Sequence, residues 1–300
     1  CDIGQRPVDI HISALKKMGV AVTEAFGHIE CSGKPKGAKI ALSFPSVGAT
    51  ENIILAAVTA EGVTEISNAA REPEITDLAE FLNKCGGDIR GAGGGNIVIH
   101  GVKKLHGCEY TIMPDRIACA TFLACTAAAG GEITAKKCDP KHLDAVLSVF
   151  EQMGCRIHTL SDTICFSAKK PLKAVDTVRT MVYPGFPTDC QAFVMAALCK
   201  AEGTSVFVEN IFENRYQHTG GFQRMGADIR VEGKVAVVEG VKRLYGAKTS
   251  APDLRGGAGL VAAALSAEGT SEIEDIHYID RGYEAIEKTL SAVGADIQRV

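Results

Sequence analysis

Four short stretches of the chain combine charged residues with glycine and proline, and so interrupt an otherwise apolar sequence. They are CDIGQRPVDIH (1–11), YPGFPTDCQ (183–191), APDLRGGAG (251–259) and IHYIDRGYE (276–284). Arg6, Arg255 and Arg281 lie in three of these glycine-bearing loops. Because the planar guanidinium group matches carboxylates and phosphates, these arginines are expected to converge on one polyanionic ligand.

Asp189 has two possible roles, one structural and one chemical. It follows Pro187 and precedes a strongly apolar helix predicted at 190–199. Aspartate is a preferred helix N-cap, and the residue pattern alone favours that role. The alternative is a carboxylate at a domain edge that takes a proton from a substrate hydroxyl.

Asp253 and Asp280 each stand close to an arginine in sequence, at Arg255 and Arg281. One interpretation of each pair is an ordinary surface ion pair, which contributes little to stability. The other is that both arginines take part in binding the polyanion. The sequence leaves the two interpretations open.

A fifth stretch, FPSVGATEN (44–52), is predicted to open a helix. Free backbone amides at a helix N-terminus, with a glycine that permits close approach, suit a phosphate group. Ser46, Val47 and Gly48 are therefore candidate phosphate ligands. An ordinary N-cap by Ser46 is the alternative, and the pattern alone favours it.

The chain has 11 cysteines, scattered without a CxxC pair. This pattern predicts neither a zinc site nor a redox motif, and it is typical of a reducing compartment. Most cysteines have apolar neighbours, as in IACATFLACTAAA (117–129), where they act as small core residues. Cys1 differs because polar residues surround it, and the nearby Arg6 favours a reactive thiolate. The histidines show no metal-ligand spacing, so no metal site is expected.

A chain of 300 residues can form one large domain or two of ordinary size. Its formal net charge of −4 argues against general binding of nucleic acid. No apolar run reaches the roughly 18 residues that a membrane-spanning helix needs. We therefore expect a cytoplasmic protein that binds neither nucleic acid nor membrane.

A repeat runs through the chain. The segments LKKMGVAV, LNKCGGDI, FEQMGCRI, FQRMGADI and LSAVGADI each indicate a helix end, a glycine and a strand. Successive glycines are separated by 67, 68, 72 and 68 residues, and they are Gly19, Gly86, Gly154, Gly226 and Gly294. A period near 68 is longer than the common solenoid repeats, so a solenoid is discounted.

The repeat predicts buried helices covered by sheets. Helices such as NIILAAVTA (52–60) and GLVAAALSA (259–267) are apolar almost all round and are expected to be buried. Strands such as 64–67 alternate in polarity, so one face of each sheet should meet solvent. The result is an inside-out α/β fold.

Eight motifs occur in a fixed order: CDIGQRPVDIH, FPSVGAT, NAAREPEI, PDRI, FPTDCQA, FENR, DLR and IDRGYE. In that order, from Cys1 to Val300, they resemble the UDP-N-acetylglucosamine 1-carboxyvinyltransferase family of enolpyruvyl transferases. The resemblance implies two domains, each of three inside-out βαβαββ units, in agreement with the repeat. We expect a partial UDP-sugar-binding domain over 1–115 and a second domain over 116–300 that carries the general base. Family members carry roughly a hundred further residues before this cysteine, including a Lys-Asn pair and an arginine that help bind phosphoenolpyruvate, so the first domain is expected to be incomplete.

The resemblance implies transfer of the enolpyruvyl group of phosphoenolpyruvate to the 3-hydroxyl of UDP-N-acetylglucosamine, with release of phosphate. Asp189 would act as the general base on that hydroxyl. Cys1 would lie on a mobile loop, donate a proton to C3 or assist product release, and be the thiol that fosfomycin alkylates. Arg6 and Arg281 would hold the anionic phosphoenolpyruvate and stabilise charge as phosphate leaves. Asp253 and Arg255 would form a conformational pair nearby, and Arg215 would be a further basic residue at the cleft.

The resemblance also assigns the nucleotide end of the substrate. Uridine would rest on Arg6, Pro7, Val8, Asp9 and Ile10, and the diphosphate would lie near Ser46, Val47 and Gly48. Phe44 stands where some family members have a lysine, which would weaken phosphate binding. No metal or organic cofactor is implied. Two alternatives remain: a catalytically inactive chain that only binds UDP-sugar, and the sister enzyme that acts on shikimate 3-phosphate.

Overall fold

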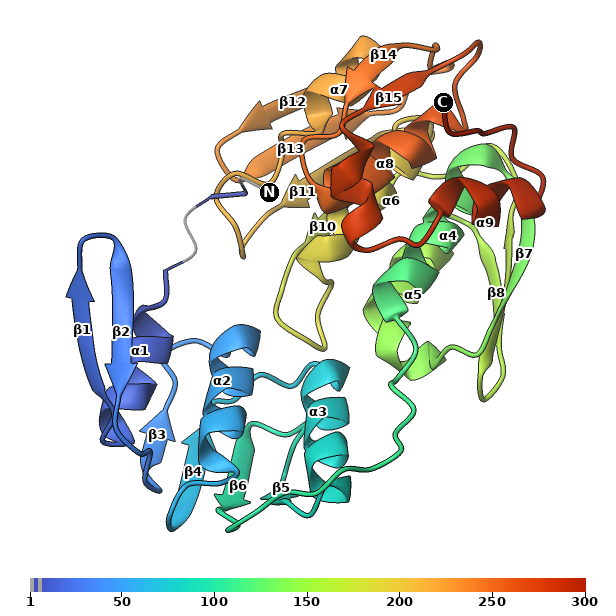
Figure 1. Ribbon diagram of the computed structural model, residues 1–300. Helices are drawn as coiled ribbons and strands as arrows, with labels where there is room; N and C mark the ends of the chain where they lie inside the picture. Colours follow the sequence, from blue (N-terminus) through green and yellow to red (C-terminus); the bar gives the residue numbers. More distant parts are fainter. Residues whose placement is uncertain (1–2, 5–6) are drawn as a thin grey trace. The chain divides into compact units, whose positions relative to one another are not determined.

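The computed structural model describes residues 3–4 and 7–300 (Figure 1). Its contacts divide the chain into two compact units. The N-terminal unit ends at Met113, and the C-terminal unit begins at Pro114 and also includes Ile3 and Gly4. Among the helices of the described residues, none is both long and apolar enough to cross a membrane.

The N-terminal unit combines helices with a hairpin and a four-stranded sheet. Its elements are α1 (Asp9–Lys17), β1 (Ala21–Ala25), β2 (His28–Ser32), β3 (Lys39–Ala41), α2 (Val47–Ala57), β4 (Val63–Ser67), α3 (Pro73–Lys84), β5 (Asp88–Arg90) and β6 (Asn96–His100). Strands β1 and β2 form the antiparallel hairpin. The larger sheet has the order β3-β4-β6-β5, in which β3 and β4 are parallel and the other pairs are antiparallel.

The C-terminal unit contains three sheets and a set of apolar helices. Its helices are α4 (Arg116–Ala129), η1 (Pro140–Leu143), α5 (Asp144–Gln152), η2 (Thr188–Cys190), α6 (Gln191–Leu198), α7 (Thr219–Arg224), α8 (Leu254–Ala264), η3 (Ile276–Arg281) and α9 (Ile286–Ala292). Its strands are β7 (Gly131–Lys136), β8 (Arg156–Thr159), β9 (Thr163–Ala168), β10 (Thr177–Arg179), β11 (Thr204–Val208), β12 (Asp228–Glu232), β13 (Val235–Glu239), β14 (Lys248–Ser250) and β15 (Glu272–Glu274). The sheets have the orders β7-β9-β8, β10-β11-β13-β12 and β14-β15.

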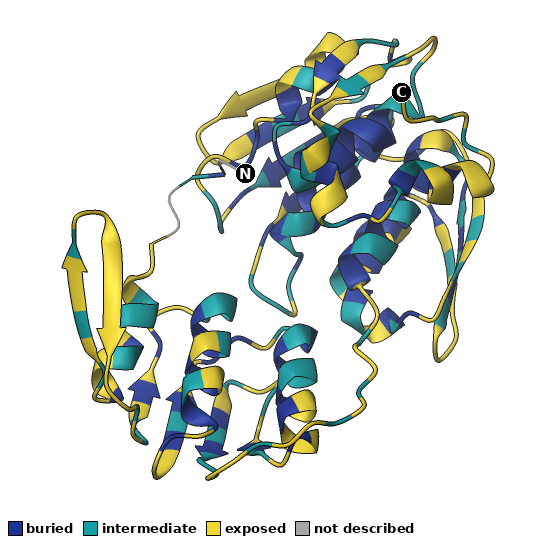
Figure 2. Ribbon diagram, in the orientation of Figure 1, coloured by how far each residue is buried: buried dark blue, intermediate teal, exposed yellow. Residues whose placement is uncertain are grey.

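Helices α4, α6 and α8 pack against one another inside the C-terminal unit, and the sheets lie around them (Figures 1 and 2). Every residue of α6 is buried, and so is the stretch 256–263 of α8. The two helices approach closely because α8 carries Gly259, where a Cβ would lie 3.1 Å from the backbone of Ala192. These helices confirm the inside-out fold predicted from their apolar sequences.

The sequence repeat corresponds to a repeated topology. The elements β3-α2-β4-α3-β5-β6 and β10-α6-β11-α7-β12-β13 are both βαβαββ units, and their sheets share strand order and strand directions. The five repeat glycines all have left-handed backbone conformations, with φ between +80° and +101°. Because L-residues rarely adopt such angles, glycine at each helix end explains why the repeat is visible in the sequence.

Helix α2 corrects one expectation. Its sequence is as apolar as that of α8, and burial all round was predicted. The side chain of Leu55 is nevertheless 52% exposed, although Ile53 and Ile54 are fully buried. Within its unit α2 contacts α1, α3 and strands of the four-stranded sheet, and these neighbours cover only part of its circumference.

Candidate active site

Asp189 lies in η2, immediately before the buried helix α6. The N-cap role favoured by the sequence is wrong, because Cys190 occupies that position and no side chain caps α6. Instead, Oδ1 of Asp189 accepts a hydrogen bond of 3.0 Å from Nε of Arg255. Arg215 approaches the same oxygen, with Nη2 at 3.9 Å. Because the side chain is 43% exposed, the carboxylate is both held by arginines and open to a ligand.

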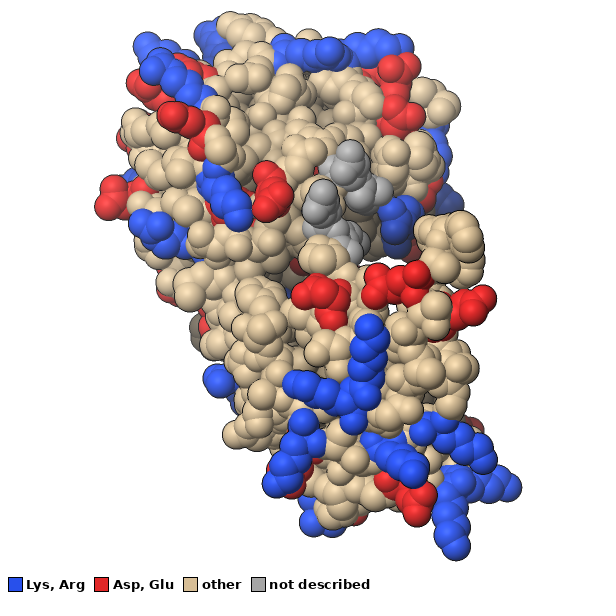
Figure 3. Space-filling model, turned by 90° about the vertical axis from the view of Figure 1, so that its left-hand side faces the viewer, with Lys and Arg blue, Asp and Glu red and all other residues tan. Residues whose placement is uncertain are grey.

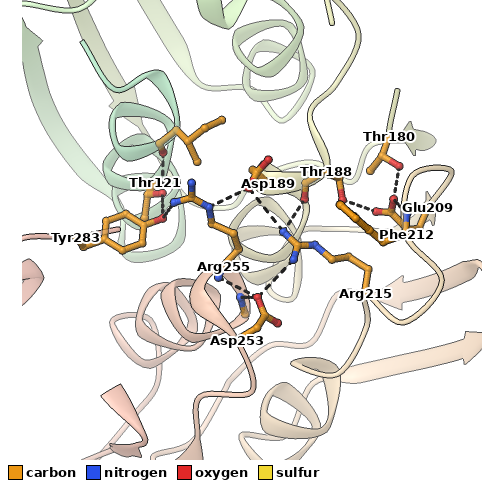
Figure 4. Close-up of polar contacts among 12 residues, drawn as sticks. Thr121, Thr180, Thr188, Asp189, Glu209, Phe212, Arg215, Asp253, Arg255 and Tyr283 are labelled. Carbon is orange, nitrogen blue, oxygen red and sulfur yellow. Dashed lines mark hydrogen bonds and ion pairs between the residues drawn. The ribbon is translucent and has the colours of Figure 1, made fainter. Parts of the chain in front are cut away.

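Arg255, on the first turn of α8, is fixed from two sides (Figure 4). Besides its bond to Asp189, its Nη1 donates to the Tyr283 hydroxyl at 3.0 Å. That hydroxyl is 2.8 Å from Oγ1 of Thr121 on α4. Burial opposes the charge on Arg255, but its interactions with Tyr283 and Asp189 raise its pKa above the ordinary value. The guanidinium group is therefore a permanent, oriented positive charge beside Asp189.

A second ion pair joins Arg215 to Asp253. Arg215 Nη1 lies 3.4 Å from Oδ1 of Asp253, and the two side chains are only 6% and 3% exposed. Asp253 also caps α8, because its Oδ1 accepts hydrogen bonds from the amides of Arg255 and Gly256. The surface ion pair considered for Asp253 is therefore wrong: the residue is a buried cap that links the two arginines.

His218 packs beside this buried pair. It is buried, its ring makes an edge contact with Phe222, and its Nε2 has no partner among the described residues. Burial lowers the pKa of His218 to about 4, and the nearby Arg215 charge acts in the same direction against the opposing effect of Asp253. The imidazole is therefore neutral near pH 7 and adds no charge to the site.

Arg281 ends η3, which packs against α8, and its side chain is exposed. The next residue, Gly282, is close to Arg255: a Cβ there would lie 3.5 Å from Nη1. The segment of Arg281 therefore reaches the Arg255 side of the site. Asp280 does form an exposed ion pair, but its partner is Arg299, with Nη2 and Nη1 at 2.6 and 3.0 Å from the two carboxylate oxygens.

In the N-terminal unit, the candidate phosphate ligands lie at the start of α2. Ser46 is the N-cap, and its Oγ accepts a bond of 3.3 Å from the amide of Ala49. The ordinary capping role of Ser46 is thus confirmed, and it does not exclude ligand binding by the first-turn amides, which have no acceptor inside the helix. Gly48 faces His11, whose Nε2 would lie 3.2 Å from a Cβ at position 48.

Pro7, Val8 and Asp9 line a surface hollow of about 690 Å³ that runs along α1. Lys16 and Lys17 lie in its wall. Basic side chains gather on the lower part of the face drawn in Figure 3, which belongs to the N-terminal unit. Ile10 is half-buried and packs against the unit's core, so of residues 7–10 it has the least access to a ligand.

Two predicted site residues, Cys1 and Arg6, lie outside the described residues. Across the rest of the chain, 3–4 and 7–300, no group of three or more His, Cys, Asp and Glu side chains is placed to hold a metal ion. Tyr283, Thr121 and Arg116 were not predicted as site residues from the sequence. Arg116 is buried, and its guanidinium lies 5.6 Å from the ring centre of Tyr183. Arg116 and Tyr283 stand in the motifs PDRI and IDRGYE, which could have drawn attention to both.

Comparison with known proteins gives consistent relatives. The family described as EPSP synthase (3-phosphoshikimate 1-carboxyvinyltransferase) matches residues 1–290. UDP-N-acetylglucosamine 1-carboxyvinyltransferase 2 of Caldanaerobacter subterraneus is 53% identical, over 100% of this chain and 72% of that protein. UDP-N-acetylglucosamine 1-carboxyvinyltransferase 1 of Symbiobacterium thermophilum is 50% identical, over 100% of this chain and 68% of that protein.

Solved structures share the fold at low sequence identity. The enolpyruvyl transferase NikO from Streptomyces tendae aligns with a TM-score of 0.87 and 24% identity, over 98% of this chain and 72% of that chain. EPSP synthase from Acinetobacter baumannii aligns with a TM-score of 0.73 and 20% identity, over 99% of this chain and 73% of that chain. These likenesses confirm the predicted fold class.

Proposed function

Because the chain belongs to the UDP-N-acetylglucosamine 1-carboxyvinyltransferases of the enolpyruvyl transferase family, we propose that it catalyses the reaction of that name. The enolpyruvyl group of phosphoenolpyruvate is transferred to the 3-hydroxyl of UDP-N-acetylglucosamine, and phosphate is released. This is the step that commits UDP-N-acetylglucosamine to peptidoglycan synthesis, and we place it in the cytoplasm. The observation that carries the proposal is the half-exposed Asp189 carboxylate held by Arg255.

Asp189 is proposed as the general base. A sugar hydroxyl is a poor nucleophile, and a positioned carboxylate contributes about 10²–10⁴-fold to such a proton transfer. Both arginines approach Oδ1, and Oδ2 receives no hydrogen bond from the described residues. Oδ2 is therefore the oxygen that we assign to the 3-hydroxyl proton, as the hydroxyl oxygen bonds to C2 of phosphoenolpyruvate.

The arginines are proposed to stabilise the anionic co-substrate. Arg255 and Arg281 come from adjacent segments of the C-terminal unit, and fixed positive charge stabilises the phosphate as it departs. Arg215 and Asp253 hold Arg255 and the start of α8 in place. Arg6 is proposed as a further phosphoenolpyruvate ligand, and Cys1 as the residue that donates a proton to C3 or assists product release and that fosfomycin alkylates.

The N-terminal unit is proposed to bind the nucleotide. Pro7, Val8, Asp9 and Ile10 would contact uridine, and the first-turn amides at Ser46, Val47 and Gly48 would receive the diphosphate. The hollow beside Pro7, which Lys16 and Lys17 line together with Asp9 and Glu24, supports this assignment. Phe44 is exposed next to this helix start and supplies no positive charge to the diphosphate.

Phosphate release is the direct test. The chain is incubated with phosphoenolpyruvate and either UDP-N-acetylglucosamine or shikimate 3-phosphate, and phosphate is measured over time. We expect release with the UDP-sugar, none with the shikimate compound, and inhibition after treatment with fosfomycin. Release only with shikimate 3-phosphate would assign the chain to the other reaction. Saturable binding of the UDP-sugar without release would favour a chain that only binds it.

A further inference from the structure

A second carboxylate, Glu209, is hydrogen-bonded to η2, the element that carries Asp189, and takes no direct part in the proposed reaction. It follows the last residue of β11 and is 1% exposed. A buried carboxylate is costly unless hydrogen bonds replace its water. Its presence at this place therefore needs an explanation in terms of what it holds.

Glu209 receives four hydrogen bonds, and Figure 4 shows those from the hydroxyls of Thr180 and Thr188. Its Oε2 accepts from Oγ1 of Thr188 at 2.9 Å, and its Oε1 accepts from Oγ1 of Thr180 at the same distance. Oε1 also accepts from the amides of Ile211 and Phe212, at 2.8 and 3.1 Å. Both oxygens are thus occupied by donors of the protein itself, so the carboxylate is a structural anchor and not a base.

The four donors come from two sides of the site. Thr188 immediately precedes Asp189. On the other side, Phe212 lies under Arg215, whose guanidinium is 5.8 Å from the ring centre and whose Nη2 donates to the Thr188 carbonyl at 3.5 Å. Glu209 therefore joins the segment that carries the proposed base to the segment that carries Arg215.

We propose that Glu209 is a positioning residue, which acts through Thr188 to hold the Asp189 carboxylate in its place beside Arg255. The inference rests on the proposed function, because the base that it positions is Asp189. General-base catalysis depends strongly on distance, and a misplacement of about 1 Å can cost about 10²-fold in rate. The bond between Glu209 and Thr188 is the contact on which this effect depends.

Thr180 offers a matched control. Its hydroxyl donates to the same carboxylate, also at 2.9 Å, and the residue is more deeply buried than Thr188. Its other polar contacts, however, go to the amide and side chain of Asn210, away from Asp189. If Glu209 served only to stabilise the fold, loss of either threonine hydroxyl would have similar consequences.

The first experiment measures kcat, KM for UDP-N-acetylglucosamine and the thermal midpoint in Thr188→Val, Thr188→Ser, Thr180→Val and Glu209→Gln. We expect Thr188→Val and Glu209→Gln to lower kcat by about 10–100-fold. Thr188→Ser should restore kcat, because it returns the hydroxyl, and Thr180→Val should lower it much less than Thr188→Val even if both lose similar thermal stability. Equal losses of kcat in the two valine variants, or kcat values that simply follow the thermal midpoints, would overturn the inference.

The second experiment needs no substrate and remains decisive if the chain transfers no enolpyruvyl group. With arginine labelled by ¹⁵N, NMR measures solvent exchange of the Arg255 Nε–H, which donates to Asp189. Displacement of Asp189 should speed this exchange in Thr188→Val and Glu209→Gln, and leave it near the wild-type rate in Thr180→Val. Unchanged exchange in Thr188→Val would refute the positioning role, whereas absent turnover with the expected exchange pattern would refute only the proposed function.

Discussion

The Asp189 network of the C-terminal unit and the start of α2 in the N-terminal unit present charge recognition in two different ways. Around Asp189, charged side chains come from η2, from the turn that precedes α7, and from the start of α8. They bind one another, and several are almost fully buried. At the start of α2, by contrast, the candidate ligands are backbone amides beside Ser46 and Gly48, and these residues are partly exposed. The first arrangement fixes the position of charges, and the second offers uncharged donors to an anion.

The difference indicates where each kind of chemistry belongs. Proton transfer needs a base held to within a fraction of an ångström, and a network of mutual ion pairs and hydrogen bonds provides such rigidity. Binding a diphosphate needs only convergent donors and close approach, which a helix N-terminus provides without buried charge. Substitutions in the first region should therefore affect the rate, the stability or both, and those in the second should affect affinity.

The largest effect is expected at Asp189. Asp189→Asn keeps the shape of the side chain but removes the base, so phosphate release should fall by about 10²–10⁴-fold while the thermal midpoint changes little. Asp280→Asn is the control, because Asp280 also pairs with an arginine and is similarly exposed, 39% against 43%, but its partner is Arg299 and not Arg255. Unchanged turnover in Asp189→Asn would remove Asp189 from its proposed role.

Loss of the buried ion pair should be the largest effect on stability. Arg215→Ala leaves Asp253 buried without its cationic partner and should lower the free energy of unfolding by about 3–5 kcal/mol. Arg243→Ala is a control at equal geometry, because Arg243 Nη1 also lies 3.4 Å from a carboxylate oxygen, that of Glu268, but the two side chains are 64% and 55% exposed. Its loss should cost less than about 1 kcal/mol in denaturant unfolding. Similar costs for the two variants would contradict the account of the buried network.

His218 predicts how stability depends on pH. Its pKa in the folded protein is about 4, below the ordinary value of 6.5, because burial disfavours the charged ring. Between pH 6.5 and 4, this histidine is therefore protonated in the unfolded chain and neutral in the folded protein. The free energy of unfolding should fall as the pH drops through this range, by as much as about 3 kcal/mol. His218→Gln should flatten this decline in denaturant unfolding at several pH values, whereas substitution of the exposed His158 should not. A decline of equal size in His218→Gln would assign it to other groups.

The smallest effect is expected at Gly48. An added Cβ at Gly48 would press against His11 and crowd the approach to the first-turn amides. Gly48→Ala should weaken binding of UDP by about 10-fold, the loss of roughly one hydrogen bond to a charged group, without slowing the chemical step. Gly107→Ala is the matched control, because among the described residues, its own chain neighbours aside, no atom lies within 4 Å of its Cβ position. Calorimetry measures the affinity of both variants for UDP. Equal affinities in the two variants would show that the start of α2 does not bind the nucleotide.

Much of the fold could be predicted because it depends on local patterns. The positions that follow α1, α3, α5, α7 and α9 have left-handed backbone angles, which favour glycine. The repeat is therefore visible in the sequence as regularly spaced glycines. The burial of α6 and α8 likewise follows from apolar sequence. The exposure of Leu55 could not be predicted in this way, because it depends on which elements surround α2 and not on the sequence of α2.

The site was less accessible to sequence reasoning. Asp189, Arg255 and Asp253 were recognised as candidates, but the local roles suggested for Asp189 and Asp253 were wrong, since their partners lie far away in the chain: Arg255 is 66 residues from Asp189. Glu209 was not recognised at all. Its sequence context, VFVEN, indicates an ordinary exposed residue at the end of a strand, and only the folded chain brings Thr180 and Thr188 to its carboxylate.

The most direct test of the account is a calorimetric titration of the wild-type chain with UDP-N-acetylglucosamine and with UDP alone, repeated with Asp189→Asn. If the sugar hydroxyl meets Asp189, the UDP-sugar should bind the wild-type chain about 10-fold or more tightly than UDP, and Asp189→Asn should lose most of that difference while its affinity for UDP stays the same. Equal affinities of the wild-type chain for UDP and the UDP-sugar would contradict the account, because the Asp189 network would then have no part in holding the substrate.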